Sequence, residues 1–309
     1  MPFMIEMWQH ALAAVRDGDR AVLVMVVDHE GSVPGTTGAA LVVTDTGVVG
    51  TVGGGVAEHE IIGQAQTFSG RPELVDVEHT PEASGSLCSG RHTMVVMALQ
   101  PEALSIIEAI VDTLSKHRAG VLELSHEGIE FTSGSSGPTA FSTGADGWRF
   151  VITAGLIHTL TIVGGGHCAL ALSRVMATLP FKIVVLDDRA GLPTMAANSF
   201  AHRLDVVPYA DLAEHIEQGG RSWVVVMTFG HANDEKALRA LVGLKLRYLG
   251  LLGSASKVQQ MFDRMRDDGV PQSFLDSVSA PVGLSIGSHT PEEIAISIAA
   301  EIIKEMNRD

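Results

Sequence analysis

Cysteine, aromatic residues and long apolar runs are all scarce in this sequence of 309 residues. Its two cysteines, Cys88 and Cys168, form neither a CxxC motif nor a zinc-ligand series, which favours free thiols in a reducing compartment. No apolar run reaches the roughly 20 residues that a membrane-spanning helix needs. The N-terminal segment also lacks the basic start of a signal peptide. We therefore expect a cytoplasmic protein with no membrane partner.

Positive charge is also in deficit. Lysine and arginine together number 21 against 36 aspartates and glutamates, which gives a net charge of −15. This balance argues against a nucleic-acid partner, whose phosphates repel an acidic protein. It leaves an anionic small ligand open, because backbone amides at a helix start bind phosphate even in an acidic protein. The length and the hydrophobic fraction of 46% are typical of a folded α/β protein with two domains.

The N-terminal part, residues 1–124, predicts a mixed α/β domain. A helical pattern over 5–15 precedes a strand over 21–28, and a hairpin turns at 45–47. Three glycines, Gly53, Gly54 and Gly55, then open a helix that runs to about residue 68. Strands over 73–78 and 93–98 and a helix over 101–117 follow. Residues 125–158 give a weak signal around a stretch rich in Ser and Gly, so we predict a linker or crossing segment there.

From residue 159 to residue 309, short apolar runs alternate with helical patterns. The runs cover residues 160–163, 183–186, 204–207, 223–227 and 247–251. Apolar strands separated by helices indicate a parallel sheet that is covered on both faces. We therefore predict a Rossmann-type doubly wound domain over 159–309. Its last helix has a clear start, with Thr290 as the N-cap, Pro291 at the first helical position and Glu293 completing a capping box.

A glycine-rich loop follows the first of these strands. Gly164, Gly166 and Ala169 stand between an apolar strand and a helix, which is the context that a GxGxx(G/A) phosphate-binding motif needs. Asp187 lies 23 residues after Gly164, near where an acid that binds ribose belongs. The nearby Arg189 is also compatible with a ribose that carries a 2′-phosphate. The loop predicts a phosphate-bearing ligand, and the alternative is a doubly wound domain whose loop is merely tight.

Two later segments also follow strands, at the edge where ligands bind in open α/β sheets. His231, in the segment 228–234, is a candidate ligand or, like most scattered histidines, a surface residue. Ser254 and Lys257 stand at a predicted helix start and are candidates for an anion site. Their alternative is an ordinary N-cap with a solvated lysine. Cys168, in the first turn after the glycine loop, is interpreted as buried and inert.

Taken in order, these motifs resemble the XdhC/CoxI family, the accessory proteins of xanthine dehydrogenase and related molybdenum hydroxylases. The resemblance spans nearly the whole chain. The N-terminal motifs are Gly31-Ser32-Val33-Pro34, Gly38-Ala39, Gly50-Thr51-Val52-Gly53-Gly54-Gly55-Val56-Ala57-Glu58 and Leu87-Cys88-Ser89-Gly90. The C-terminal motifs are the glycine loop, Asp187-Asp188-Arg189, residues 228–234, Gly253-Ser254 with Lys257, and residues 280–287 and 290–295. The sequence departs from the family at Gly35 and Ser256, where the family often has a basic residue.

The resemblance implies a protein that binds the molybdenum cofactor, protects it while a sulfido ligand is installed, and delivers it. The recipient that it implies is a molybdenum hydroxylase of the xanthine dehydrogenase type. It implies no catalytic residue in this chain. A cysteine desulfurase as a second partner and a homodimer also follow from the resemblance.

Residues of the N-terminal half then become candidates for holding this cofactor. Backbone donors of Gly53, Gly54 and Gly55 fit its phosphate or its pterin edge. Glu58 fits the amino groups of the pterin, and its alternative is a solvated first-turn glutamate favoured by the helix dipole. Cys88 is a soft candidate ligand for the molybdenum or a sulfur-relay group, and its alternative is a packed small residue.

The same glycine loop also leaves open two functions of other classes: an NAD(P)-dependent oxidoreductase and a nucleotide-sensing regulatory module. An oxidoreductase needs a proton-transfer group near the nicotinamide, and the sequence has no Tyr-x-x-x-Lys pair. His231 and Asp234 are its only candidates. Binding of NAD or NADP would separate this alternative from a cofactor chaperone.

Overall fold

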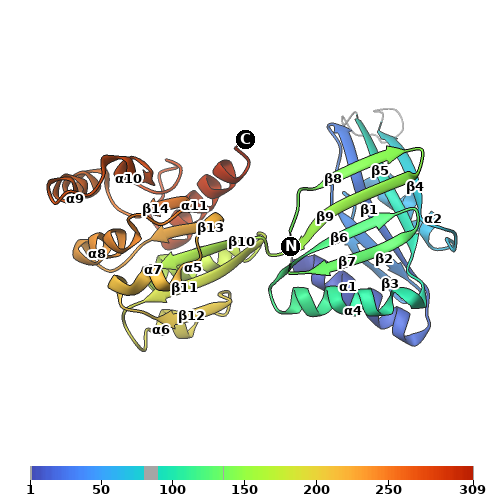
Figure 1. The fold of residues 1–309 in the computed structure, drawn as a ribbon, viewed down its shortest axis with the longest axis horizontal. Helices are drawn as coiled ribbons and strands as arrows, with labels where there is room; N and C mark the ends of the chain where they lie inside the picture. Colours follow the sequence, from blue (N-terminus) through green and yellow to red (C-terminus); the bar gives the residue numbers. More distant parts are fainter. Residues whose placement is uncertain (1, 80–89, 135, 309) are drawn as a thin grey trace. The chain divides into compact units, whose positions relative to one another are not determined.

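The computed structural model describes residues 2–79, 90–134 and 136–308. The chain divides into two compact units, Met1–Gly155 and Leu156–Asp309 (Figure 1). Each unit encloses its own hydrophobic core. Within the described residues, none of the helices combines the length and the apolar composition that a membrane crossing requires.

The first unit is organised around a five-stranded antiparallel sheet. Its strands are β1 (Ala21–Gly31), β2 (Ala40–Thr44), β3 (Gly47–Thr51), β4 (Glu73–His79) and β5 (Gly90–Ala98). Their order across the sheet is β3-β2-β1-β5-β4. β1 lies at the centre because the run 21–27 is apolar, which lets it be buried on both faces of the sheet. These strands agree with those predicted from the sequence to within a few residues at each end.

A second, four-stranded antiparallel sheet corrects the domain boundary predicted from the sequence. β6 (Ala119–Ser125), β7 (Gly128–Ser133), β8 (Ala140–Gly144) and β9 (Gly147–Gly155) pair in the order β7-β6-β9-β8. The prediction of a linker over 125–158 is therefore wrong, and the first unit extends to Gly155. The serines and threonines of β7 and β8 weaken the sequence signal because they are exposed. Leu122, Leu124 and Phe150 supply the buried side of this sheet.

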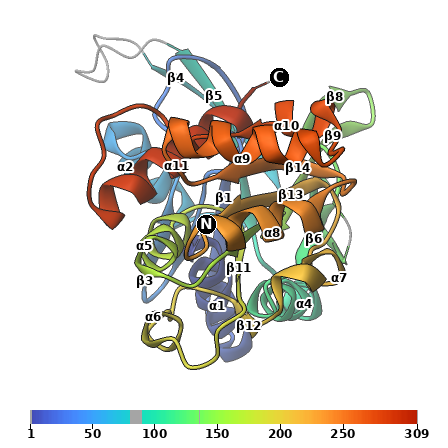
Figure 2. The ribbon, with the colours of Figure 1, turned by 90° about the vertical axis from the view of Figure 1, so that its left-hand side faces the viewer.

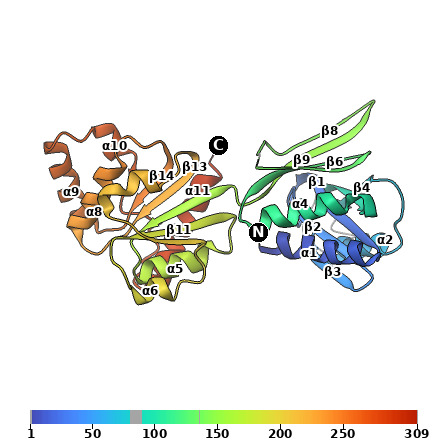
Figure 3. The same cartoon turned by 60° about the horizontal axis from the view of Figure 1, so that its bottom comes forward.

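Helices cover both faces of the five-stranded sheet (Figure 3). α1 (Pro2–Asp17) packs on β1, β2 and β3, and α4 (Leu104–Ser115), which follows the short 3-10 helix η1 (Pro101–Ala103), packs on β6, β7 and β9. α1 and α4 also contact each other, so that both sheets share one core. α2 (Gly55–Ala65) covers the opposite face, where Ile61 and Ala65 pack with Val24 and Val26.

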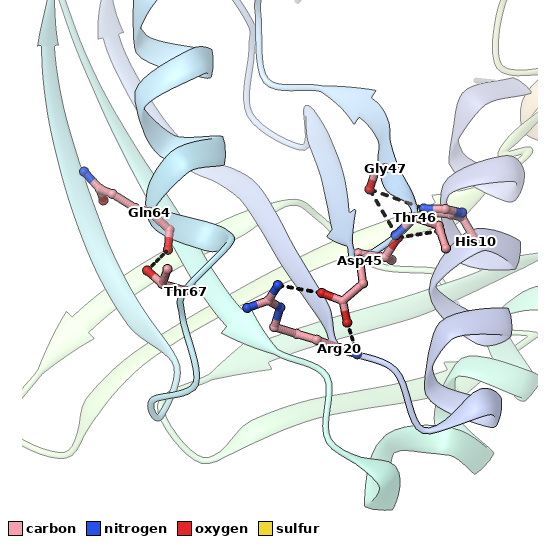
Figure 4. A network of polar contacts seen from close by, with 8 residues as sticks. His10, Arg20, Asp45, Thr46, Gly47, Gln64 and Thr67 are labelled. Carbon is pink, nitrogen blue, oxygen red and sulfur yellow. Dashed lines mark hydrogen bonds and ion pairs between the residues drawn. The ribbon is translucent and has the colours of Figure 1, made fainter.

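Polar contacts tie the β2–β3 hairpin to the elements around it (Figure 4). The Arg20 guanidinium, just before β1, donates to the Asp45 carboxylate at 2.6 Å. His10 Nε2 of α1 lies 2.8 Å from the Thr44 hydroxyl and 3.5 Å from the Gly47 carbonyl oxygen. These contacts fix β3, and therefore the start of the glycine triplet that follows it.

The second unit is built on a six-stranded parallel sheet. Its strands are β10 (His158–Val163), β11 (Phe181–Asp187), β12 (Arg203–Val206), β13 (Gly219–Val226), β14 (Leu246–Leu251) and β15 (Val278–Ser279). Their order is β12-β11-β10-β13-β14-β15, and every neighbouring pair is parallel. This is the strand order of a doubly wound nucleotide-binding fold, with its topological switch point between β10 and β13. The predicted fold class is confirmed.

Helices cover both faces of the parallel sheet (Figure 2). α5 (His167–Met176) and α11 (Pro291–Met306) lie on one face, and α7 (Leu212–His215), α8 (His231–Leu241), α9 (Ala255–Asp267) and α10 (Gln272–Asp276) lie on the other. The short helices α6 (Pro193–Ala196) and η2 (Tyr209–Asp211) follow β11 and β12. Alternate residues of β11 serve the two cores: Ile183 and Val185 face α5 and α11, whereas Val184 and Leu186 face the other side. The capping box predicted at the start of α11 is present.

Candidate functional site

The glycine loop of the second unit connects β10 to α5, at the switch point of the sheet. Gly164 has a φ of +111°, and a Cβ there would lie 2.4 Å from the Met227 carbonyl oxygen. A Cβ on Gly165 would lie 2.7 Å from the Met195 sulfur. A Cβ on Gly166, in contrast, would meet nothing within 4 Å. Packing therefore accounts for the first two glycines, and Gly166 keeps an open backbone face beside the free amide groups of the first helical turn.

Asp187 ends β11 and is fully buried beside this loop. Its carboxylate accepts hydrogen bonds from the Gly165 amide at 2.6 Å and from the Arg189 amide at 2.9 Å. The Arg189 side chain adds two donors, Nε at 2.9 Å and Nη2 at 2.8 Å. Burial opposes ionisation of the carboxyl, but these hydrogen bonds outweigh it and lower the pKa of Asp187. Asp187 is thus an ionised carboxylate that positions the glycine loop.

Arg189 also joins the segments that follow β11 and β13. Its Cζ lies 5.7 Å from the ring centroid of Phe229, whose side chain is 76% exposed. A guanidinium over an aromatic face is attracted by the ring quadrupole. Since β11 and β13 flank β10, this contact brings together residues from both sides of the glycine loop. Ala169, in the first turn of α5, is buried against the sheet.

His231 and Asp234 occupy the first turn of α8. Asp234 is 5% exposed, and its Oδ1 accepts from the Thr228 amide at 2.9 Å and from the Thr228 hydroxyl at 2.6 Å. Burial raises the pKa of Asp234, against the effect of these two hydrogen bonds. His231 is exposed. The Asp234 carboxyl therefore fixes the turn between β13 and α8, whereas His231 is open to solvent.

Ser254 and Lys257 lie at the start of α9. Ser254 is the N-cap residue, yet its side chain makes no capping hydrogen bond, and its hydroxyl lies 3.3 Å from that of Ser256. Lys257 is exposed, and its backbone amide donates to the Ser254 carbonyl oxygen. The capping bond that the simpler interpretation expects is not formed. Both residues stay candidates for an anion site.

The glycine triplet of the first unit, Gly53, Gly54 and Gly55, follows β3 and includes the first residue of α2. The three residues have φ values of +126°, +78° and +77°, a region that side chains disfavour. A Cβ on Gly53 would lie 2.1 Å from the Pro34 carbonyl oxygen. A Cβ on Gly54 or Gly55 would meet nothing within 4 Å. The triplet thus consists of one packed residue and two residues with open space beside them.

Glu58, in the first turn of α2, holds this triplet in place. Its Oε2 accepts from the Thr51 hydroxyl at 2.6 Å, from the Val52 amide at 2.8 Å and from the Gly54 amide at 3.0 Å. Burial opposes ionisation of the carboxyl, but these hydrogen bonds outweigh it and lower the pKa of Glu58. Oε1 takes no part in the three bonds. Glu58 is therefore an ionised group whose Oε2 holds the loop in shape.

The turn at Pro34 and Gly35 packs on the triplet backbone to backbone. Gly35 has a φ of +87°, and a Cβ there would lie 2.1 Å from the Val52 carbonyl oxygen. No residue with a side chain fits at this position unless the loop moves.

Three histidines lie next to this turn, and none of them stands out in the sequence. His92 Nε2 lies 3.1 Å from the Gly35 carbonyl oxygen, and His92 Nδ1 lies 3.0 Å from His79 Nε2. Because a carbonyl oxygen only accepts, His92 carries its proton on Nε2 and accepts at Nδ1 from His79. His92 and His79 are buried, and the exposed His29 stands opposite His92 across β1 and β5. Strand register is the signal that would have found them, since it places His29 beside His92.

The buried histidine pair predicts a pH dependence for the first unit. Burial lowers the pKa of His92, and the charges of His79 and His29 add to this effect against the hydrogen bond to Gly35. Since the folded pKa lies below the unfolded value of about 6.5, the unfolded chain takes up the proton first. The stability contribution is complete above about pH 6.5 and is lost as the pH falls below it. We expect Tm to fall more steeply from about pH 7.5 to 5.5 in the wild type than in His92→Gln, and equal slopes would contradict this.

The candidate residues described above lie in two places: at the glycine triplet of the first unit and at the carboxyl edge of the parallel sheet in the second unit. Cys88, the candidate ligand for molybdenum, lies outside the described residues. Cys168 is partly exposed, and burial together with the charge of Glu292 raises the pKa of its thiol. Over residues 2–79, 90–134 and 136–308, no group of three His, Cys, Asp or Glu side chains is placed to hold a metal ion.

Family models and relatives match both units of this chain. A model of the XdhC Rossmann domain matches residues 160–302, and a model of the XdhC and CoxI family matches residues 14–78. The protein YqeB of Escherichia coli (strain K12) is 27% identical over 92% of this chain, which spans only 43% of the length of YqeB. A Bacillus subtilis (strain 168) protein, named as a probable xanthine dehydrogenase subunit, is 25% identical over 96% of each chain.

A solved structure has the same fold. The crystal structure of a xanthine dehydrogenase from Bacillus halodurans matches with a TM-score of 0.78 and 23% sequence identity, over 98% of this chain and 95% of that one. The two family models fall on the two units in the order that the motifs predict. The chain belongs to the XdhC and CoxI family.

Proposed function

We propose that this protein binds the molybdenum cofactor, protects it during sulfuration and delivers it to a molybdenum hydroxylase of the xanthine dehydrogenase type, with no turnover of its own. Membership of the family and the Bacillus subtilis relative, whose name refers to xanthine dehydrogenase, support an association with such an enzyme. The observation that carries the cofactor assignment is the glycine triplet, where two open glycines stand beside an ionised carboxylate.

The triplet offers the groups that a pterin with a phosphate needs. Gly54 and Gly55 let a ligand approach the backbone, and α2 begins at Gly55 with the free amides of its first turn. In this proposal Glu58 Oε1 accepts from the pterin amino groups, while Oε2 keeps the loop in shape. The cofactor is cargo, so these residues bind and orient it and carry out no chemical step.

The proposal includes a cytoplasmic setting and two protein partners. A cysteine desulfurase supplies the sulfur, and the apo-hydroxylase receives the finished cofactor. Two copies of the chain form a homodimer. Cys88 stays a prediction from the sequence, as a soft ligand for the molybdenum.

The direct test is co-purification. Protein expressed in cells that make the cofactor and purified without oxygen is expected to carry it in stoichiometric amount, as measured by mass spectrometry of the released small molecule. Co-expression is expected to raise the activity of an apo-hydroxylase severalfold. A preparation that holds no cofactor and leaves the hydroxylase unchanged would overturn the proposal.

Glu58→Ala is expected to lower cofactor retention at least about tenfold, because a lost hydrogen bond to a charged group is worth about 1.5–3 kcal/mol. The variant also releases the Thr51 hydroxyl and the Gly54 amide, so the loop loses its shape. Glu60→Ala is the matched control, since Glu60 is an exposed glutamate two residues along the same helix. Equal retention by both variants would show that Glu58 is not part of the site.

A further inference from the structure

The ribose-binding position of this Rossmann unit is occupied by the chain itself. In dinucleotide-binding folds, the acid at the end of the second strand accepts hydrogen bonds from the ribose hydroxyls. Asp187 has that position at the end of β11, but it is fully buried and takes four donors from the protein. Gly165 supplies one donor, and Arg189 supplies three. No oxygen of Asp187 is left for a ribose.

Separating the Arg189 side chain from Asp187 is unfavourable in free energy. Its guanidinium meets both carboxylate oxygens as a fork, at 2.9 Å to Oδ1 and 2.8 Å to Oδ2, and its other face lies over the ring of Phe229. A ribose that displaced it would leave a buried carboxylate without its cation. The same ion pair disfavours a 2′-phosphate, because Asp187 already neutralises Arg189 and Asp188 adds a second negative charge nearby.

We propose that Arg189 is a specificity-determining residue that closes this Rossmann unit to NAD and NADP by occupying the ribose acceptor Asp187. Rossmann units with this strand order bind such dinucleotides in other proteins. The fold itself therefore does not exclude NAD or NADP, and the pairing of Arg189 with Asp187 does. The inference concerns the second unit alone, and it holds whether or not the molybdenum cofactor binds to the first.

Titration calorimetry of the full chain with NAD⁺ and with NADP⁺ tests this inference. The wild type is expected to show no saturable binding of either dinucleotide up to millimolar concentration. Arg189→Ala frees Asp187 and is expected to gain at least tenfold in affinity for NAD⁺. Adding Asp187→Asn to Arg189→Ala is expected to remove most of the gain, because an amide is a poorer acceptor for the ribose hydroxyls. Arg174→Ala, an exposed arginine on α5, is the control and should gain nothing.

Arg189→Lys covers the case in which Arg189→Ala does not fold, because lysine keeps a cation beside Asp187 but lacks the fork. It is expected to gain severalfold in affinity for NAD⁺, and circular dichroism and Tm report whether each variant is folded. Micromolar binding of NAD⁺ or NADP⁺ by the wild type would overturn the inference. So would a folded Arg189→Ala or Arg189→Lys that gains no affinity.

Discussion

Gly53→Ala is expected to destabilise the first unit by at least about 3 kcal/mol, because the change combines a steric clash with backbone strain. The new Cβ would lie 2.1 Å from the Pro34 carbonyl oxygen, and backbone atoms on that side have no rotamer through which to escape. A φ of +126° adds strain for any residue with a side chain. Peptide-resolved hydrogen exchange in urea measures the loss and assigns it to β1 and its neighbours.

Gly55→Ala separates this packing effect from ligand binding. Its φ of +77° costs about 1–2 kcal/mol in alanine, but the Cβ would meet nothing within 4 Å. We expect this variant to keep most of its stability and to lose cofactor retention, because the methyl group fills the space that the ligand needs. A stability loss as large as that of Gly53→Ala, or unchanged retention, would show that the triplet is only a tight turn.

The sequence alone does not distinguish a packed glycine such as Gly53 from an open one such as Gly55. It shows three consecutive glycines before a helix, but the clash of Gly53 depends on Pro34, which comes from a separate turn. The helix, the hairpin and the parallel sheet follow from periodicity, which is a local property of the chain. The contact between Gly35 and Val52 depends on how the two turns meet, and no local pattern encodes it.

Asp187 shows that the spacing of a motif predicts the position of a residue but not its hydrogen-bond partners. The spacing from Gly164 correctly places an acid at the end of the second strand. It says nothing of the partner, and a side chain only two residues away takes both carboxylate oxygens. The same reason explains the missed histidines, because His29, His79 and His92 come together only through the register of β1, β4 and β5.

Asp187→Ala is expected to destabilise the second unit by about 1–3 kcal/mol, the cost of leaving a buried hydrogen-bond donor without its acceptor, since the partly exposed Arg189 can turn to water. The change leaves the Gly165 amide and the Arg189 fork without their acceptor, beside a loop that depends on both. Asp188→Ala is the matched control, since Asp188 is the next residue and is partly exposed. We expect it to cost less than about 1 kcal/mol. Hydrogen exchange of β10 and β11 measures both losses.

Acid titration gives the same carboxylate a second test. The folded pKa of Asp187 lies below its unfolded value of about 3.9, because hydrogen bonds from Arg189 and Gly165 outweigh its burial. Its stability contribution is therefore complete above about pH 4 and is lost as the pH falls through the lower folded value. Asp187→Asn keeps the shape of the side chain without the charge, so its second unit is expected to be weaker at neutral pH and less sensitive to acid. An acid profile of β10 and β11 parallel to that of the wild type would show that the ion pair does not organise the glycine loop.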